Sequence, residues 1–168
     1  LVYLATGRLI PPAGLPLQVG CVVNNVETLF NVFQASQGIP VTHKFVSVTG
    51  LVAEPSCFHV PLGTSLGQVL EWAGGVTRPD VAVFLNGLMM GRMVSDLAEP
   101  VIKTTGALIV LPADHPLVGR QSRPLEAKHR IGKSACDQCS YCTELCPRYL
   151  LGYEVQPHKV MRSLGFTA

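Results

Sequence analysis

The sequence predicts an α+β protein in which one sheet-forming region is flanked by helical segments. Two strand-like segments, a short amphipathic segment and two more strand-like segments follow one another between residues 42 and 112. This order, within about 70 residues, is typical of a sheet with one helix packed across a face. The flanking residues 1–40 and 114–168 show helical periodicity or loop composition instead.

The segment "NNVETLFNVFQASQG" predicts a helix before the sheet. Its apolar residues recur at the i, i+3, i+4, i+7 spacing of one helix face, at Val26, Leu29, Phe30 and Phe33. Asn24 or Asn25 is the expected N-cap, and Glu27 stands three residues after Asn24, as in a capping box. Gly38 and Pro40 end the helix.

The sheet region begins with alternating polar and apolar residues. "THKFVSVTGLV" predicts a strand with Lys44, Val46 and Val48 on one face, and "CFHVP" predicts a shorter second strand. "TSLGQVLEWAGG" predicts a helix that ends at two glycines and has an apolar face of Leu66, Val69, Leu70 and Ala73. "VAVFLNG" and "GALIVLP" predict two further strands.

Three features outside these elements carry weaker predictions. Met89 and Met90 lie between two glycines, which predicts a tight turn whose side chains fill gaps in the packing; contact with a cofactor or partner is the alternative. Cys21 and Cys57 have no partner at a ligand spacing, so we expect buried thiols. Residues 113–134 are polar and basic and predict a linker, whose charges are either solvated or dock an acidic electron-transfer partner.

Composition excludes several functional classes. The chain has 168 residues, a net charge of +2 and only 14% charged residues, which argues against nucleic-acid binding. No run approaches about 18 consecutive apolar residues, so no membrane span is predicted. No hydrolase or kinase motif stands out. The first residues lack both a Met and the features of a signal peptide, so we expect both ends to have been cut from a longer protein.

Four cysteines lie within eleven residues, at Cys136, Cys139, Cys142 and Cys146, and Pro147 follows the last. The spacing C-x2-C-x2-C-x3-C-P is that of bacterial ferredoxins and predicts a [4Fe–4S] cluster. In two-cluster ferredoxins the fourth cysteine ligates the other cluster. Structural zinc is the main alternative, although its sites more often use two separated cysteine pairs. A disulfide or free thiols are the remaining alternatives. After the motif, "PHKVMRSLGF" predicts a helix that begins at Pro157.

Several segments resemble one family of electron-transfer flavoproteins. "VVNNVETLFNV" is similar to a segment shared by the flavin-binding subunit of respiratory complex I and the C subunit of the Rnf electron-transport complex. "VSVTGLVAEPSCFHVPLGTSLGQVLEWAGG" resembles their SLBB domain, a soluble-ligand-binding β-grasp. "CDQCSYCTELCPRYLLGYEVQPHKVMRSLGF" most resembles the PduS-type cobalamin reductases. The resemblance extends from about Ala5 to Phe166.

The resemblance implies an NADH-oxidising flavoprotein that carries FMN and two [4Fe–4S] clusters. It places Asn24, Asn25 and Thr28 at the flavin, whereas the residues by themselves favour a plain helix cap. It divides the chain into part of a flavin/NADH-binding domain at 1–40, an SLBB domain at 41–113, a linker at 114–134 and a partial ferredoxin-type segment at 135–168. The Gly-rich flavin/NADH segment and a second cysteine motif would lie outside these residues, so we expect the chain alone to be inactive.

The resemblance therefore predicts the electron-transfer part of an NADH-dependent FMN and iron–sulfur oxidoreductase, most like the cobalamin reductases of propanediol-utilisation microcompartments. Its partners would be the missing flavin/NADH domain, the second cluster motif and an acceptor, either cobalamin or a cobalamin-linked enzyme, in the cytoplasm or inside a microcompartment. One alternative is the C subunit of an Rnf-type ferredoxin:NAD oxidoreductase, peripheral at the inner membrane and partnered with Rnf subunits and ferredoxin. Another is a non-enzymatic SLBB module that binds a ligand or partner, with a structural metal.

Overall fold

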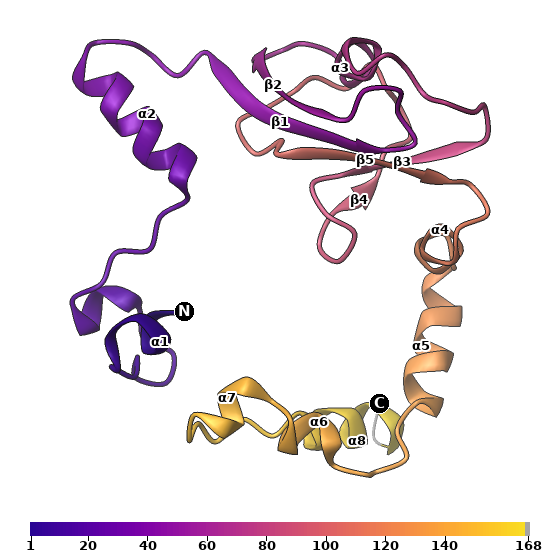
Figure 1. Cartoon of the computed structure of the whole chain (residues 1–168). Helices are drawn as coiled ribbons and strands as arrows, with labels where there is room; N and C mark the ends of the chain where they lie inside the picture. The colour runs from indigo at the N-terminus through magenta and orange to yellow at the C-terminus, as the bar shows by residue number, and fades with distance from the viewer. Residues whose placement is uncertain (167–168) are drawn as a thin grey trace. The chain divides into compact units, whose positions relative to one another are not determined.

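The computed structural model describes residues 1–166, which form two compact units (Figure 1). The larger unit is Asn25–Ser122 and contains the sheet. The smaller unit combines Leu1–Asn24 with the residues from Arg123 onward and contains the cysteine motif. Each unit is a separate body and is described by itself. Residues 167 and 168, the end of the predicted ferredoxin-type segment, lie outside the described residues.

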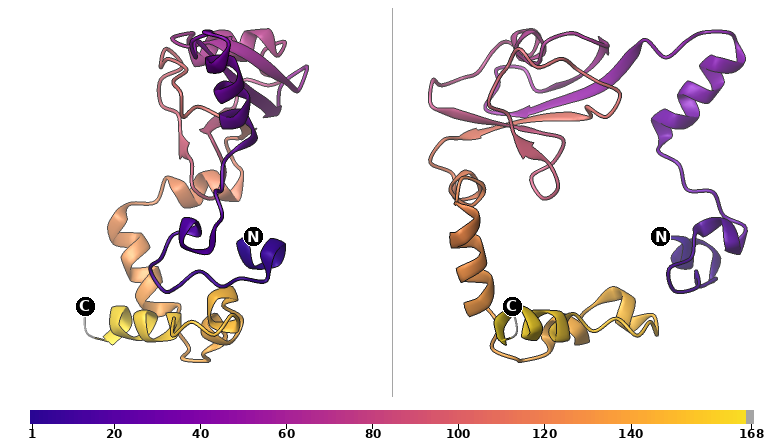
Figure 2. Two further views of the ribbon diagram at one scale, coloured as in Figure 1. Left: turned by 90° about the vertical axis from the view of Figure 1, so that its left-hand side faces the viewer. Right: turned by 180° about the vertical axis from the view of Figure 1, so that it is seen from behind.

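A five-stranded mixed sheet forms the centre of the larger unit (Figure 2). Its strands are β1 (His43–Gly50), β2 (Ser56–Pro61), β3 (Val81–Leu85), β4 (Arg92–Met93) and β5 (Ala107–Pro112). They lie in the order β2-β1-β5-β3-β4. Only β1 and β5 are parallel; the other neighbours are antiparallel. The predicted α+β organisation is confirmed, and the two-residue strand β4 is an addition to it.

The core lies between one face of the sheet and helix α3 (Leu66–Trp72). The central buried side chains are at most 4% exposed, and they are Val46, Val48, Val60, Leu66, Val69, Leu70, Leu108 and Val110. In the strands these residues alternate with less buried ones, and in α3 they recur at helical spacing, so both elements turn one apolar face toward the same layer. Burial of each such side chain stabilises the fold by roughly 1.5–3 kcal/mol. The predicted core faces of β1 and α3 are confirmed.

The close pairing of β1 with β5 depends on Gly50. Its φ is +95°, a backbone conformation that favours glycine. A Cβ atom at this position would lie 2.0 Å from the carbonyl oxygen of Val110 on β5. Any larger residue would therefore force the two strands apart at the end of β1.

Helix α2 (Val26–Ser36) confirms the predicted helix, and its apolar face is largely exposed. Val26, Leu29 and Phe33 are 80%, 56% and 61% exposed. Phe30 contacts β1 through the ring of Phe45, at a centroid distance of 5.6 Å. Periodicity shows which face of a helix is apolar, but not what covers that face.

Two predictions about single side chains are wrong. Met89 and Met90, in the turn between β3 and β4, are 93% and 98% exposed and fill no gap. The turn itself is anchored at its base by Asn86, whose Oδ1 accepts a hydrogen bond from the Gly106 N–H at 2.8 Å. Cys57 is exposed rather than buried, because Phe58 and Val60 take the core face of β2 and Cys57 points to the other face.

The residues predicted as a linker contain two helices, α4 (Pro116–Gln121) and α5 (Leu125–Ser134). His115 caps α4, since its Nδ1 accepts a hydrogen bond from the Leu117 N–H at 3.2 Å. In α5, Glu126 lies in the first turn and Lys133 in the last, which suits the helix dipole.

Up to residue 166, the smaller unit contains helices, turns and loops but no strand. Besides α5 these are α1 (Val2–Thr6), a 3-10 turn (Pro16–Val19), α6 (Tyr141–Glu144), α7 (Pro147–Leu150) and α8 (Pro157–Phe166). Helix α8 confirms the predicted start at Pro157 and packs against α5 and α6. No helix within residues 1–166 is both long and apolar enough to cross a membrane.

Candidate functional site

The cysteine motif occupies a loop and the two short helices that follow it. Cys136 and Cys146 are half-buried, while Cys139 and Cys142 are exposed, and all of these thiols are free. Cys142 lies within α6, and Cys146 is the N-cap residue of α7. Pro147 begins α7, a position where the missing N–H of proline costs no helical hydrogen bond. The disulfide alternative is not formed.

The loop around Cys139 has an unusual backbone. Gln138 and Ser140, on either side of it, have φ values of +55° and +63°. Left-handed backbone at non-glycine residues costs of order 1–3 kcal/mol each and is found most often at functional sites and ligand clamps. These two left-handed residues make the backbone turn sharply between Cys136 and Cys142.

The four thiols lie on one short segment but do not converge in this structure. Within the described residues, no three His, Cys, Asp or Glu side chains are grouped closely enough to hold one metal ion. The ligand assignment of Cys136, Cys139, Cys142 and Cys146 therefore stays a prediction. The donor set itself, four thiolates at this spacing, is what a [4Fe–4S] cluster requires.

Hydrogen bonds of two residues, Thr143 and Tyr153, tie the cysteine segment to other parts of the smaller unit. Thr143, within α6, is 5% exposed, and its Oγ1 lies 2.7 Å from Nδ1 and 3.1 Å from the backbone nitrogen of His158 on α8. The Tyr153 hydroxyl donates to the carbonyl of Ile10, which joins the segment to the first residues of the chain. These links span 15 and 143 residues of sequence, and no local pattern indicates them.

A second candidate site is a hollow of about 560 Å³ in the larger unit, beside the start of α2. It is lined by Asn25, Glu27, Thr28, Asn31, Val41, Lys44, Lys103, Thr104 and Gly106. The structure thus places the predicted flavin residues Asn25 and Thr28 on one hollow. Asn24 is exposed and is not among the lining residues.

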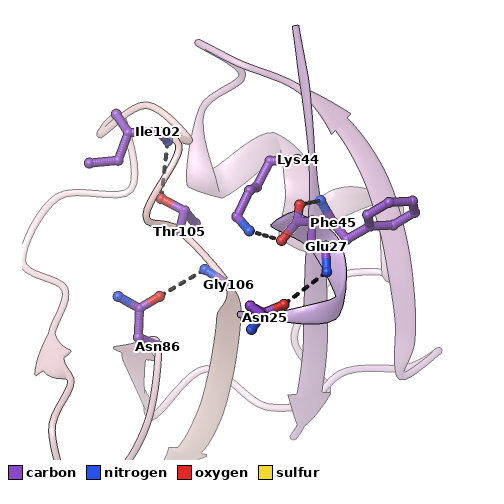
Figure 3. Close-up of polar contacts among 8 residues, drawn as sticks. All are labelled: Asn25, Glu27, Lys44, Phe45, Asn86, Ile102, Thr105 and Gly106. Carbon is purple, nitrogen blue, oxygen red and sulfur yellow. Dashed lines mark hydrogen bonds and ion pairs between the residues drawn. The ribbon is translucent and has the colours of Figure 1, made fainter. Parts of the chain in front are cut away.

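Glu27 fixes the start of α2 against β1 (Figure 3). One carboxylate oxygen bonds the Lys44 ammonium, and the other accepts from the Phe45 N–H at 3.1 Å. Burial raises the pKa of Glu27, but the Lys44 hydrogen bond, the Phe45 N–H and the charges of Lys44 and His59 outweigh it, so the pKa lies below the ordinary value. The predicted capping box is not formed, because Glu27 bonds the strand instead.

Asn25 acts as the helix cap, as the residues by themselves indicated. Its Oδ1 accepts a hydrogen bond from the Glu27 N–H at 3.0 Å, so the side-chain amide N–H₂ is the group left for another partner. On the opposite wall, Thr105 is buried and its Oγ1 accepts from the Ile102 N–H at 3.1 Å, which fixes the loop that presents Lys103 (Figure 3). Sequence reasoning missed both lysines of this hollow, since they are 59 residues apart.

Two regions of the chain match known domain families. Residues 45–92 match the SLBB domain, and residues 135–168 match the 4Fe-4S dicluster domain. The first range covers most of the sheet region and the second contains all four clustered cysteines. The iron–sulfur interpretation of the motif is thereby supported at the level of the domain.

Whole-chain similarity points to oxidoreductases. The chain is 45% identical over 166 residues to the cobalamin reductase PduS of Citrobacter freundii and, equally, to that of Salmonella typhimurium, an overlap of 98% of this chain and 37% of each relative. It is 30% identical over 152 residues to the C subunit of the proton-translocating ferredoxin:NAD(+) oxidoreductase complex of Clostridium ljungdahlii, covering 89% of this chain and 31% of that protein. The chain is thus a relative of these proteins and spans 31–37% of their length.

Proposed function

We propose that this relative of the cobalamin reductases is the electron-transfer part of an NADH-dependent FMN and iron–sulfur oxidoreductase that reduces a cobalamin. The observation that supports it most is the 45% identity to cobalamin reductase PduS over 98% of the chain, including a dicluster-type cysteine segment. The protein would act in the cytoplasm or inside a microcompartment, with cobalamin or a cobalamin-linked enzyme as acceptor.

Cys136, Cys139 and Cys142 would hold one [4Fe–4S] cluster, and Cys146 would contribute to a second. In the two-cluster pattern each cluster takes three cysteines from one motif and one from the other. The further ligands would come from the part of the protein that corresponds to the remaining length of the relatives. The clusters supply one-electron transfer, and the chain's own residues set their burial and the hydrogen bonds to sulfur, which tune the potential.

The hollow beside α2 would contribute one wall of the FMN site. The Asn25 amide and the Thr28 hydroxyl, which both line the hollow, can hydrogen-bond a polar ring edge. For Asn24, which does not line it, only the family resemblance supports a flavin contact. Lys44 and Lys103 give the hollow two cations, and the Lys44 charge is largely offset by Glu27. Lys103 is then the side chain best suited to an anionic phosphate. FMN supplies the exchange between two-electron and one-electron chemistry when bound.

One wall is not a complete flavin site. Residues 1–168 contain no Gly-rich phosphate segment and no nicotinamide-binding motif. We expect the isolated chain to bind FMN weakly or not at all and not to oxidise NADH. Tight, stoichiometric FMN binding by these 168 residues would show that the site is complete within them.

A second candidate function is supported by the 30% identity to the C subunit of the ferredoxin:NAD(+) oxidoreductase complex. In that case the protein would lie at the inner membrane beside other Rnf subunits and exchange electrons with ferredoxin. The full-length protein separates the two functions. NADH-dependent reduction of cob(III)alamin favours the cobalamin reductase, and ferredoxin-linked activity without it favours the Rnf protein.

The non-enzymatic alternative, an SLBB module with structural zinc, predicts a different metal. If the proposed redox function is correct, anaerobically purified protein should instead contain iron with acid-labile sulfide. Zinc in stoichiometric amount, without sulfide, would overturn the redox function and leave a binding module. This measurement does not depend on the acceptor.

Two substitutions test the division of the cysteines between clusters. In the full-length protein, Cys139→Ser should remove the electron paramagnetic resonance (EPR) signal of the first cluster and leave the second largely intact. Cys146→Ser should do the reverse. If both variants remove the same signal, all four cysteines serve one cluster and the two-cluster assignment is wrong.

A further inference from the structure

Thr143 stands out among the buried residues of the molecule. Within residues 1–166 only two polar side chains are buried, Thr105 and Thr143. Thr105 bonds the backbone three residues away, inside its own loop. Thr143 instead bonds a residue 15 positions later, on another helix. It is also the residue between Cys142 and Cys146 that points inward.

Thr143 Oγ1 contacts His158 at two atoms, the backbone nitrogen and Nδ1 of the ring. The backbone N–H of His158 donates to Thr143 Oγ1 at 3.1 Å, and the same oxygen lies 2.7 Å from His158 Nδ1. A threonine hydroxyl has a single hydrogen. Because the hydroxyl oxygen also has two lone pairs, both contacts are satisfied in either tautomer of His158: Oγ1 donates to Nδ1 or accepts from an Nδ1–H.

This pair also caps a helix. His158 is the second residue of α8, whose first N–H groups have no acceptor within the helix. Thr143 supplies one from α6, and the two helices pack against each other. The turn that holds Cys142 and leads to Cys146 is thus fixed to the start of α8 by one hydroxyl group.

We propose that Thr143 and His158 are positioning residues for the clusters: they hold the turn between a ligand of one cluster and a ligand of the other. The inference rests on the proposed function, because it requires the two-cluster assignment. Loss of the hydroxyl would leave both the His158 N–H and Nδ1 without a partner in a largely buried place. The turn would then loosen, and Cys142 and Cys146 would change their relative placement.

The test uses anaerobically purified full-length protein and a matched set of threonine variants. Thr143→Val keeps the shape but removes the hydroxyl, Thr143→Ser restores it, and Thr77→Val removes one from an exposed position as the control. The readouts are the rate of cluster loss to a chelator and the EPR spectrum of the fully reduced protein. The line shape of two interacting paramagnetic clusters depends on their separation and orientation, which a uniform loss of stability does not change.

Thr143→Val should lose clusters to the chelator roughly tenfold faster than wild type and should show an altered line shape. Thr143→Ser and Thr77→Val should match wild type in both. If the wild type holds two clusters and Thr143→Val matches it in both the rate of cluster loss and the EPR line shape, this inference is wrong, while the proposed function stands. A wild type without iron and sulfide would overturn the proposed function, a distinguishable result.

His158 provides an independent arm if Thr143→Val does not fold. His158→Ala should reproduce the faster loss and the altered spectrum, and His158→Asn should retain much of the wild-type behaviour, because its side-chain amide can accept from or donate to the Thr143 hydroxyl. His129→Ala, an exposed histidine on α5, is the control. The double variant Thr143→Val/His158→Ala should be no worse than either single variant. Equal behaviour of His158→Ala and His158→Asn, or additive effects in the double variant, would contradict the proposal.

Discussion

The sheet region and the cysteine segment differ in what can stabilise their folded structures. Every buried apolar side chain of the described residues lies between Val46 and Val110, in the sheet region. From residue 123 to residue 165 the only buried side chain is that of Thr143. The sheet therefore has a core of its own, and the cysteine segment does not. Small segments without a core are usually held by disulfides or metals, and here the thiols are free.

The difference also separates two kinds of function. The strands and α3 form a rigid support that keeps its shape without a ligand. The cysteine segment consists of a wound loop and helices of four residues, so its order would come from the cluster that it binds.

The largest effect on stability should come from the sheet core. Leu70→Ala should lower the free energy of unfolding by about 2–5 kcal/mol, because Leu70 is 4% exposed and packed against the sheet. Leu29→Ala, on the exposed face of α2, should change it by about 0.5 kcal/mol or less. Urea unfolding of the 168-residue chain, followed by the fluorescence of its single tryptophan, Trp72 on α3, measures both. A small loss for Leu70→Ala would place that side chain at the surface.

A smaller effect should come from the link between α2 and the sheet. Glu27→Gln keeps an acceptor for the Phe45 N–H but removes the charge opposite Lys44, and should cost about 1–2 kcal/mol at neutral pH. Because the pKa of Glu27 is lowered in the folded protein, its contribution to stability is present in full above the ordinary pKa of a glutamate and is lost as the pH falls through the lower folded-state value.

Urea unfolding at a series of pH values checks whether the stabilisation by Glu27 decreases in acid, as expected. The difference between wild type and Glu27→Gln should shrink in acid, while Glu71→Gln, at an exposed position on α3, should behave like wild type throughout. A difference that stays constant across the acid range would show that the ion pair does not carry the effect.

The smallest effect should come from the turn between β3 and β4. Replacing both Met89 and Met90 by Ser should change the free energy of unfolding by no more than about 0.5 kcal/mol, because both side chains are almost fully exposed. Thermal unfolding of the double variant measures it. A loss comparable with that of Leu70→Ala would mean that the methionines pack in the folded chain after all.

The sheet region could be predicted from the sequence because its information is local. Alternation identifies β1, and capping residues and glycines delimit α3, whose apolar stripe includes Leu70. Strand order could not be predicted, since the parallel pairing of β1 with β5 joins residues 60 positions apart. The strand β4, of two residues, is too short to produce a pattern.

The candidate sites were predicted only in part. Cysteine spacing is a local signal and located the iron–sulfur segment, which the domain match supports. Residues that only folding brings together show no pattern in the sequence. Examples are Lys103, which lines the hollow, and Thr143 and His158, which are hydrogen-bonded to each other. The exposed methionines were predicted wrongly because two glycines indicate a turn but not the direction of its side chains.

Hydrogen–deuterium exchange tests most directly whether the sheet is held by its core and the cysteine segment by its cluster. The experiment compares anaerobically purified full-length protein with the same protein after a chelator has removed the iron. Amides between residues 136 and 166 should lose protection when the cluster is removed, and amides of β1, β5 and α3 should keep theirs. Unchanged protection in the cysteine segment, or a loss of protection that extends through the strands, would contradict the account.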